Sequence, residues 1–265
     1  MTKLLALFSI VLCCLSGRAL AAAPSEVVSS LAPNGRLRVA INFGNPVLAQ
    51  KDPANGAPRG VSVDLARELG RRLGVTPTFV TFDGAGKVFD ALKAGAWDLA
   101  FLAIDPVRAA EIDFTPPYVV IEGTYMVPAN SPLQTIEDVD RTGIRVAVGR
   151  GSAYDLYLTR TLKSAQLVRA STSAEAIELF QSETLEAAAG VRQPLQKAAK
   201  GNPALRVLAG RFMTIEQAMG TPKGREAGAR YLQDFVEEMK ASGFVARALA
   251  ASGQADAAVA PPAAR

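Results

Sequence analysis

The stretch AIDPVRAAEIDFTP, residues 103–116, holds the side chains best suited to ligand chemistry. Asp105 precedes Pro106 there, and this pair is typical of a helix start. The carboxylate accepts hydrogen bonds from free backbone N–H groups, and proline is tolerated at the first helical position. We therefore predict that Asp105 caps a helix rather than contacting a ligand. Arg108 then lies in the first turn, where a cation opposes the helix dipole.

Two kinds of partner could compensate the charge of Arg108, and the residues alone do not separate them. One is a surface ion pair with Asp105 or Glu111, which would contribute little. The other is a ligand carboxylate held by both arms of the guanidinium group. The second alternative makes Arg108 a candidate ligand-binding residue.

A second candidate is the stretch VGRGSAYDLY, residues 148–157. Gly149 and Gly151 permit an unusual turn, and a helix is expected to start near Ser152, with Ala153 as its first residue. Backbone N–H groups and the Ser152 hydroxyl at such a start can converge on an anion. A plain strand-to-helix turn capped by Ser152 is the alternative, and the two can hold together.

The composition argues against several other kinds of chemistry. The chain has no histidine, and both cysteines, Cys13 and Cys14, fall within the first 22 residues. The commonest general base and the commonest zinc ligands would then be missing from a mature chain. Without residues 1–22, 27 basic side chains face 25 acidic ones, which gives no reason to expect nucleic acid. We expect no metal, no cofactor and no catalytic residue.

The first 22 residues have the pattern of a secretory signal peptide. Lys3 is followed by an apolar run from Leu4 to Leu15 and by small residues around Ala21. An early cation, a short apolar run and a small-residue cleavage site mark a segment that is removed on export. The mature protein is therefore expected outside the cytoplasm.

Alternating apolar and amphipathic runs predict an α/β fold, because strands separated by helices form parallel sheets covered by helices. The first unit has strands at 37–42, 78–82 and 97–102, with helices at 63–73 and 87–94. The second unit has strands at 144–148, 167–170 and 187–191, with helices at 153–162 and 174–182.

Two β-rich stretches are expected to connect these units. They are residues 118–133 and 206–220, and a helix at 223–242 would then pack back on the first unit. A chain that crosses twice makes a two-lobed clamp with a two-segment hinge. The last residues, 253–265, are rich in alanine and proline without periodicity, which predicts a disordered tail.

Several blocks in order resemble the family 3 periplasmic solute-binding proteins, the receptors that deliver polar amino acids and related solutes to ABC transporters. The resemblance covers about residues 36–250. The blocks are LRVAIN, GVSVDLARELGRRLGV, ALKAGAWDLAFLAIDPVRAAEIDFTPPY, SPLQTIEDVDRTGIRVAVGRGSAYDLYL and ASTSAEAIELFQSETLEAA.

The resemblance implies a type II periplasmic binding protein-like fold in the periplasm. Each lobe is a mostly parallel sheet flanked by helices, with lobe 1 formed by residues 27–124 plus 215–252 and lobe 2 by 125–214. A small carboxylate-bearing solute would bind between the lobes of a monomer, and the closed form would be recognised by a membrane permease. In this family the matching arginine, here Arg108, binds the ligand carboxylate. The loop before Ala153 binds the same carboxylate in family members.

This chain departs from the family's amino-acid site. An aspartate usually pairs with the ligand ammonium at the end of the strand that matches AAAGVRQPL, but Gly190, Val191, Arg192 and Gln193 stand there. Ala103 replaces a hydroxyl residue that family members place near the arginine. We therefore predict that Arg108, joined by Arg192 and beside Val191, binds one or two carboxylates and that the ligand need not carry an ammonium group.

Three further positions bear on the ligand. Family members carry an aromatic residue near the start of the helix at Lys87; the small residues of DGAGK stand there, and Phe82 or Phe43 could supply a wall instead. Asn45 and Pro46 occupy the loop that often carries a stacking aromatic residue. Glu122, in the first connecting stretch, is either a substitute for the missing aspartate or an exposed hinge residue. Asn45 is retained as a candidate contact.

Two other function classes stay open on this fold. One is an enzyme similar to cyclohexadienyl dehydratases, which would need an acid or base in the cleft. The other is a sensory or partner-binding module that has lost amino-acid binding. Because no nucleophile, metal cluster or carboxylate pair stands out, we expect binding without catalysis.

Overall fold

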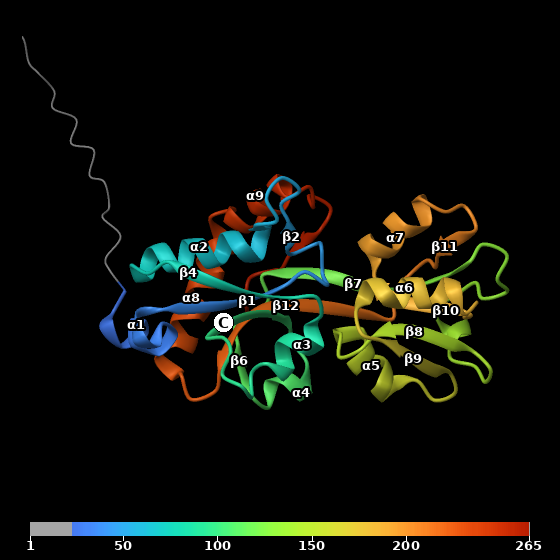
Figure 1. Cartoon of the computed structure of the whole chain (residues 1–265), viewed down its shortest axis with the longest axis horizontal. Helices are drawn as coiled ribbons and strands as arrows, with labels where there is room; N and C mark the ends of the chain where they lie inside the picture. The colour runs from blue at the N-terminus through green and yellow to red at the C-terminus, as the bar shows by residue number, and fades with distance from the viewer. Residues whose placement is uncertain (1–22, 265) are drawn as a thin grey trace, which may run out of the picture.

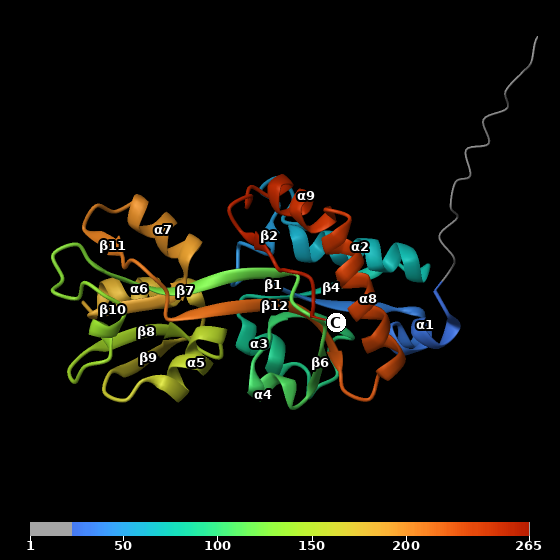
Figure 2. The ribbon, with the colours of Figure 1, turned by 180° about the vertical axis from the view of Figure 1, so that it is seen from behind.

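The chain folds into two lobes joined by two long strands. The computed structural model describes residues 23–264, so the predicted signal peptide, residues 1–22, lies outside the described residues. Figure 1 and Figure 2 show strands β7 (Val119–Pro128) and β12 (Met213–Pro222) running side by side through the middle of the molecule. They pair antiparallel, and they are the two predicted connections of the hinge.

The sheet of the first lobe has three parallel strands. Strand β1 (Leu37–Asn42) lies between β4 (Pro77–Phe82) and β5 (Leu99–Ala103), and β12 pairs antiparallel with β5. The short strand β6 (Ile112–Phe114) also pairs with β12. All five residues of β5 are buried, as expected for a strand covered on both faces.

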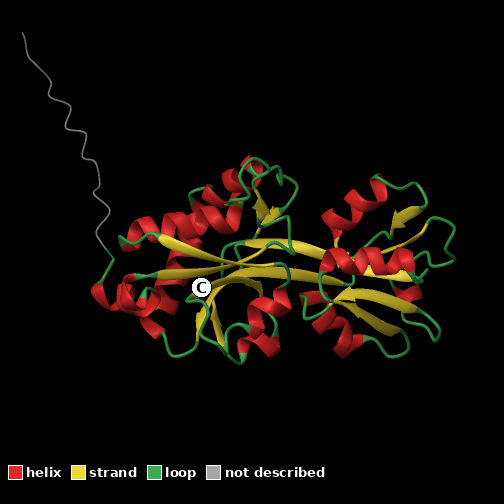
Figure 3. Cartoon of the chain, viewed as in Figure 1, coloured by secondary structure: helices red, strands yellow, loops and turns green. Residues whose placement is uncertain are grey.

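The second lobe repeats this plan. Strand β8 (Arg145–Gly149) lies between β9 (Gln166–Ala170) and β10 (Ala187–Val191), all parallel, and β7 pairs antiparallel with β10. Strand β11 (Leu205–Val207) pairs with β7. Through the hinge strands the two sheets form one continuous ladder, shown in yellow in Figure 3.

Helices cover both sheets. The first lobe carries α1 (Ser25–Leu31), α2 (Val61–Leu73), α3 (Ala85–Asp90), α4 (Pro106–Ala109), α8 (Glu226–Ala241) and α9 (Phe244–Ala251). The second lobe carries α5 (Ala153–Thr161), α6 (Ser173–Ser182) and α7 (Arg192–Lys200). The sequence pattern predicts α2, α5 and α6 to within two residues, whereas α3 ends earlier, at Asp90, and α8 begins later, at Glu226. Helices α1, α7 and α9 were not predicted.

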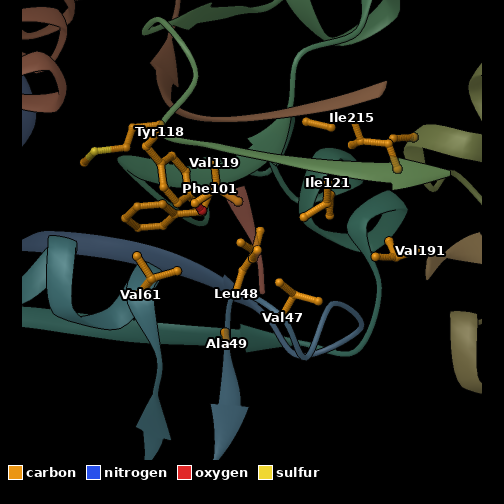
Figure 4. Packing of buried hydrophobic residues seen from close by; sticks show 14 of the residues in the cluster. Val47, Leu48, Ala49, Val61, Phe101, Tyr118, Val119, Ile121, Val191 and Ile215 are labelled. Carbon is orange, nitrogen blue, oxygen red and sulfur yellow. The ribbon is translucent and has the colours of Figure 1, made fainter. Parts of the chain in front are cut away.

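Apolar packing at the root of the hinge ties the first lobe to β7. The rings of Phe101 and Tyr118 meet edge to face with centroids 5.8 Å apart, and Figure 4 shows Val61 and Leu48 beside them. Such a ring pair adds about 1 kcal/mol beyond its buried area. The Tyr118 hydroxyl lies 3.0 Å from the Ser62 hydroxyl, so burial of the ring leaves no unpaired polar atom.

The predicted helix caps are present. The Asp105 carboxylate accepts a hydrogen bond from the Val107 N–H at 2.9 Å, and Pro106 is the first residue of α4. The Ser152 hydroxyl accepts from the Asp155 N–H at 3.1 Å at the start of α5. Both helices are thereby fixed at the ends that face the other lobe.

The prediction of a disordered tail over 253–265 needs correction. Strand β13 (Ala258–Val259) pairs antiparallel with β7, and the Ala260 N–H donates to the Tyr118 carbonyl oxygen at 3.1 Å. The Lys240 ammonium group donates to the Pro261 carbonyl oxygen at 2.8 Å. Strand β10 pairs only with the second half of β7, so the first half has an unpaired edge to which β13 can bind. This contact could not be predicted from the sequence, because pairing through backbone groups needs no hydrophobic periodicity.

Helix α8 packs against α1, β6 and β12, so the chain returns to the first lobe after its second crossing. The exact lobe boundaries, 27–124 plus 215–252 and 125–214, stay a prediction. Among residues 23–264 no helix is both long and apolar enough to cross a bilayer.

Candidate ligand-binding site

A cavity of about 320 Å³ lies between the two lobes. Asn42 at the end of β1, Ala103 at the end of β5 and Val191 at the end of β10 all line it. The carboxyl ends of parallel strands are the usual ligand-binding edge of open α/β sheets. A volume at the small end of known pockets suits a small metabolite.

Arg108 lines this cavity from α4 and is only 1 % exposed. One guanidinium arm, Nη1, donates to the Ala103 carbonyl oxygen at 3.0 Å, and the other, Nη2, donates to the Gly151 carbonyl oxygen of the second lobe at 2.8 Å. Its Nε has no hydrogen-bond partner within the described part of the chain. Because Arg108 is buried, it cannot form a surface ion pair, and of the two predicted partners only a ligand carboxylate is left.

The capping carboxylate does not neutralise Arg108. Asp105 forms its ion pair with Arg160 of α5, at 2.7 Å. Burial lowers the pKa of Arg108 to about 10, against a smaller rise from the charge of Asp105. Arg108 therefore stays protonated at neutral pH, and a buried cation of this kind favours an anionic ligand.

Two helix starts of the second lobe face the same cavity. At α5, Ser152, Ala153 and Tyr154 line it. The Gly151 N–H is already bound to the Asp155 carboxylate at 2.8 Å, so it is not free for a ligand. The first-turn N–H groups of a helix lack partners within the helix, which leaves those of Ala153 and Tyr154 as the donors that α5 can offer an anion.

The second helix start that faces the cavity is that of α6. Thr172 and Ser173 line the cavity, and the Thr172 hydroxyl caps the helix by accepting from the Glu175 N–H at 3.1 Å. The Tyr154 hydroxyl donates to the Ser173 hydroxyl at 2.7 Å, which links the two helix starts. The sequence offered a signal for this cap, since threonine followed three residues later by glutamate is a capping-box pattern.

Arg192 does not line the cavity, so its predicted role as a ligand contact needs correction. Its Nε pairs with the Glu122 carboxylate of β7 at 2.6 Å, and it also donates to the Gly210 carbonyl oxygen. Arg211 pairs with the other oxygen of Glu122 at 2.9 Å. The partners of Arg192 thus lie on hinge strand β7 and in the segment before β12, and not in the cavity.

Glu122 likewise lies outside the cavity lining. Hydrogen bonding to Arg192, with a smaller contribution from Arg211, lowers the pKa of Glu122, so the carboxylate stays ionised and satisfied. The alternative in which it replaces the family's ammonium-binding aspartate therefore has no support from the geometry, and it is a partly exposed hinge residue.

The remaining predicted residues lie around the cavity. Ala103, Ala153, Val191 and Asn45 all line it. Asn45 is 8 % exposed, its side-chain oxygen accepts from the Val47 N–H at 3.3 Å, and its amide nitrogen makes no hydrogen bond to a described residue. Of the two candidate aromatic walls, Phe43 lines the cavity.

Gln217 of β12 is a lining residue that sequence reasoning missed. It is 5 % exposed, and its side chain makes no hydrogen bond to any described residue. In the β5–β12 register it lies directly opposite Ala103, whose carbonyl oxygen holds Arg108. The sequence contained a hint of this role, because Gln217 is a polar residue next to Ala218 and Met219, which are fully buried. A buried polar side chain in a strand normally has a hydrogen-bond partner, and a ligand can be that partner.

Among the lining residues that the structure describes, Asp83 is the one with a carboxylate. It lies at the rim, its side chain is 61 % exposed, and it pairs with Lys87 at 2.8 Å. Hydrogen bonding to Lys87 lowers the pKa of Asp83, so this acid is ionised and already neutralised by a cation.

The lobes touch across the cleft. A Cβ atom on Gly86 of α3 would lie 2.8 Å from the Arg150 carbonyl oxygen, so the two lobes meet there with only hydrogen atoms between them. The Asp105–Arg160 pair and the Arg108–Gly151 hydrogen bond also bridge the lobes. The structure is therefore that of a closed clamp.

Comparison with known proteins identifies the chain. Residues 37–251 match bacterial extracellular solute-binding proteins, family 3. The chain belongs to this family. As a family 3 solute-binding protein it has the expected type II two-lobed fold, and the predicted resemblance is confirmed.

Solved structures agree with this fold. A mutant of ArgBP from T. maritima superposes with a TM-score of 0.74 at 22% identity, covering 86% of this chain and 99% of that one. The solute receptor for L-cysteine of Neisseria gonorrhoeae gives 0.73 at 23% identity, covering 85% and 92%. An ancestral amino-acid-binding protein, described as a precursor of cyclohexadienyl dehydratase, gives 0.71 at 23% identity, covering 84% and 98%.

These neighbours are too distant to transfer a ligand to this solute-binding protein. Within residues 23–264 there is also no group of three or more acidic side chains placed to hold a metal ion. The ligand has to be inferred from the cavity itself.

Proposed function

We propose that this protein is a periplasmic receptor of an ABC transporter that binds a small carboxylate-bearing solute between its lobes. The observation that carries the proposal is Arg108, a buried cation that lines the cavity, has an unpaired Nε and has no carboxylate partner among the described residues. Removing a charge from water is costly unless an opposite charge compensates it, and a ligand carboxylate supplies that compensation.

Closure of the lobes would report binding to the transporter. The ligand stabilises the closed form in proportion to its preference for that form over the open one. Arg108 contacts both lobes, through Ala103 and Gly151, so an anion on this side chain favours closure directly. We propose a monomer that is exported by residues 1–22 and recognised in its closed form by a membrane permease.

The main experiment is calorimetric titration of Arg108→Ala with solutes that bind the wild type. We expect the variant to bind at least 100-fold more weakly, because a buried charge-assisted pair contributes about 3 kcal/mol or more. Arg192→Ala is the matched control, since that arginine lies outside the cavity and pairs with Glu122. Equal affinity of wild type and Arg108→Ala would contradict the proposal.

An enzyme of the cyclohexadienyl dehydratase kind is the less supported alternative. The one carboxylate among the described lining residues, Asp83, is exposed at the rim and paired with Lys87, a poor position for general acid or base catalysis. We therefore propose binding without turnover. Incubation with prephenate or arogenate, followed by product analysis, tests this directly, because any turnover lost on mutation of a lining residue would favour the enzyme.

A further inference from the structure

We propose that the solute is a 2-oxo or 2-hydroxy carboxylate with an apolar body and no ammonium group, and that Gln217 recognises the oxygen at its second carbon. The proposal rests on the proposed function, since it assumes a carboxylate on Arg108. In this proposal, Gln217 determines whether the receptor prefers an oxygen or an ammonium group on the ligand carbon next to the carboxylate.

The first step concerns charge. Arg108 and the starts of α5 and α6 present positive charge or positive dipole ends to the cavity. The acids at the cavity and at the hinge beside it are each paired with a cation: Asp83 with Lys87, Asp105 with Arg160, Asp155 with Arg169, and Glu122 with Arg192 and Arg211. An ammonium group brought into this cavity would lose its water and find no free carboxylate among the described residues, so an amino acid is disfavoured.

The second step concerns the partner that does face the cavity. Gln217 is only 5 % exposed and lines the cavity. Its side chain makes no hydrogen bond to any described residue. Its place opposite Ala103 sets it next to the carbonyl group that holds Arg108. A neutral amide at that point donates to an oxo or hydroxyl oxygen. Its own oxygen can accept from an ammonium group, but it supplies no negative charge to offset that group in a buried site.

The third step concerns the rest of the ligand. Much of the remaining cavity wall is apolar, with Phe101, Ile177, Leu195 and Ile215 among the residues that line it. A ligand body of CH₂, CH₃ or aromatic groups gains about 25 cal/mol for each Å² that leaves water, whereas a second charged group would be buried without a partner there. A branched or aromatic side chain therefore fits this wall better than a charged one.

The experiment compares ligands that differ only at the second carbon. Leucine, 4-methyl-2-oxopentanoate and 4-methylpentanoate are titrated calorimetrically, and phenylalanine, phenylpyruvate and 3-phenylpropionate form a second set. In at least one set we expect the 2-oxo acid to bind at least tenfold more tightly than the amino acid and more tightly than the unsubstituted acid. An amino acid that binds as tightly as its 2-oxo counterpart overturns the inference.

Variants of Gln217 test the assignment to that residue. Gln217→Met should remove the advantage of the 2-oxo acid over the unsubstituted acid, and Gln217→Glu should shift the preference toward the amino acid. Glu216→Gln is the matched control, because neighbouring strand residues point to opposite faces and Glu216 is exposed. Loss of affinity for all three acids alike in a folded Gln217→Met variant, checked by its melting temperature, would contradict a role in specificity.

The two proposals fail differently. If amino acids bind better but Arg108→Ala still abolishes binding, the receptor function stands and only the inference about the ligand fails. If no acid of either set binds and no carboxylate is released from the denatured purified protein, both proposals fail.

Discussion

Arg108 is held in a position that costs stability in the absence of an anion. Its pKa of about 10, lowered by burial from the ordinary 12.5, corresponds to about 3 kcal/mol against the charged form in the folded state. This penalty is present at every pH below 10, because a base with a lowered pKa is disfavoured while protonated. Two hydrogen bonds from a charged donor, to Ala103 and Gly151, offset it.

At the residue scale, Arg108→Met is expected to abolish ligand binding while changing the stability of the ligand-free protein by only about 1 kcal/mol. Methionine fills the space, and the lost hydrogen bonds are balanced by the removed burial penalty. Urea unfolding without ligand gives this stability. A loss of more than about 4 kcal/mol would mean that Arg108 is mainly a structural residue.

Sequence reasoning reached these residues unevenly. Asp105 and Ser152 were predictable as caps because capping is local, and Arg108 stood out because a cation at a helix start needs a partner. The direction of Arg192 and the neighbours of Gln217 depend on strand pairing between distant segments, which one sequence does not display.

At the scale of elements, each lobe places its helix starts and strand ends on the cleft. The parallel strands of both lobes end at the cavity, and α3 brings Gly86 against the loop at Arg150 and Gly151. Gly86 does not have a positive φ, so its backbone suits any residue, and only the approach of the other lobe requires glycine there.

We predict that Gly86→Ala weakens ligand binding about tenfold or more without destabilising the ligand-free protein. The added Cβ would lie 2.8 Å from the Arg150 carbonyl oxygen in the closed form, whereas alanine is favoured over glycine within a helix. Calorimetric affinity and a melting curve without ligand measure the two effects. Gly95→Ala would be a poor control because Gly95 has a positive φ, and Ala91→Ser, in the same lobe, serves better.

The central strands of both sheets and helices α2, α5 and α6 were predictable because their hydrophobic periods are strong. Strand β1 matches its predicted bounds, and α2 begins two residues early, at Val61. The pairing of β13 with β7 was not predictable, since a two-residue ladder in an Ala/Pro-rich segment depends on the free edge it meets. Local pattern thus determined the elements, and the edge contacts required the assembled sheet.

At the scale of the whole molecule, the two lobes share one sheet through β7 and β12. Glu122 lies on hinge strand β7 and pairs with Arg192 and Arg211, so Arg192, a residue predicted for the ligand, binds the hinge instead. The two-lobed plan followed from the repeated pattern of strands and helices, and the closed relation of the lobes became visible only through contacts such as Asp105 with Arg160.

The most direct measurement of the central claim is native mass spectrometry of the protein purified from the periplasm without added ligand. We predict a bound organic acid that lacks an amino group on the wild type, and its loss from Arg108→Ala. A bound amino acid, or the same solute retained on Arg108→Ala, would contradict the account.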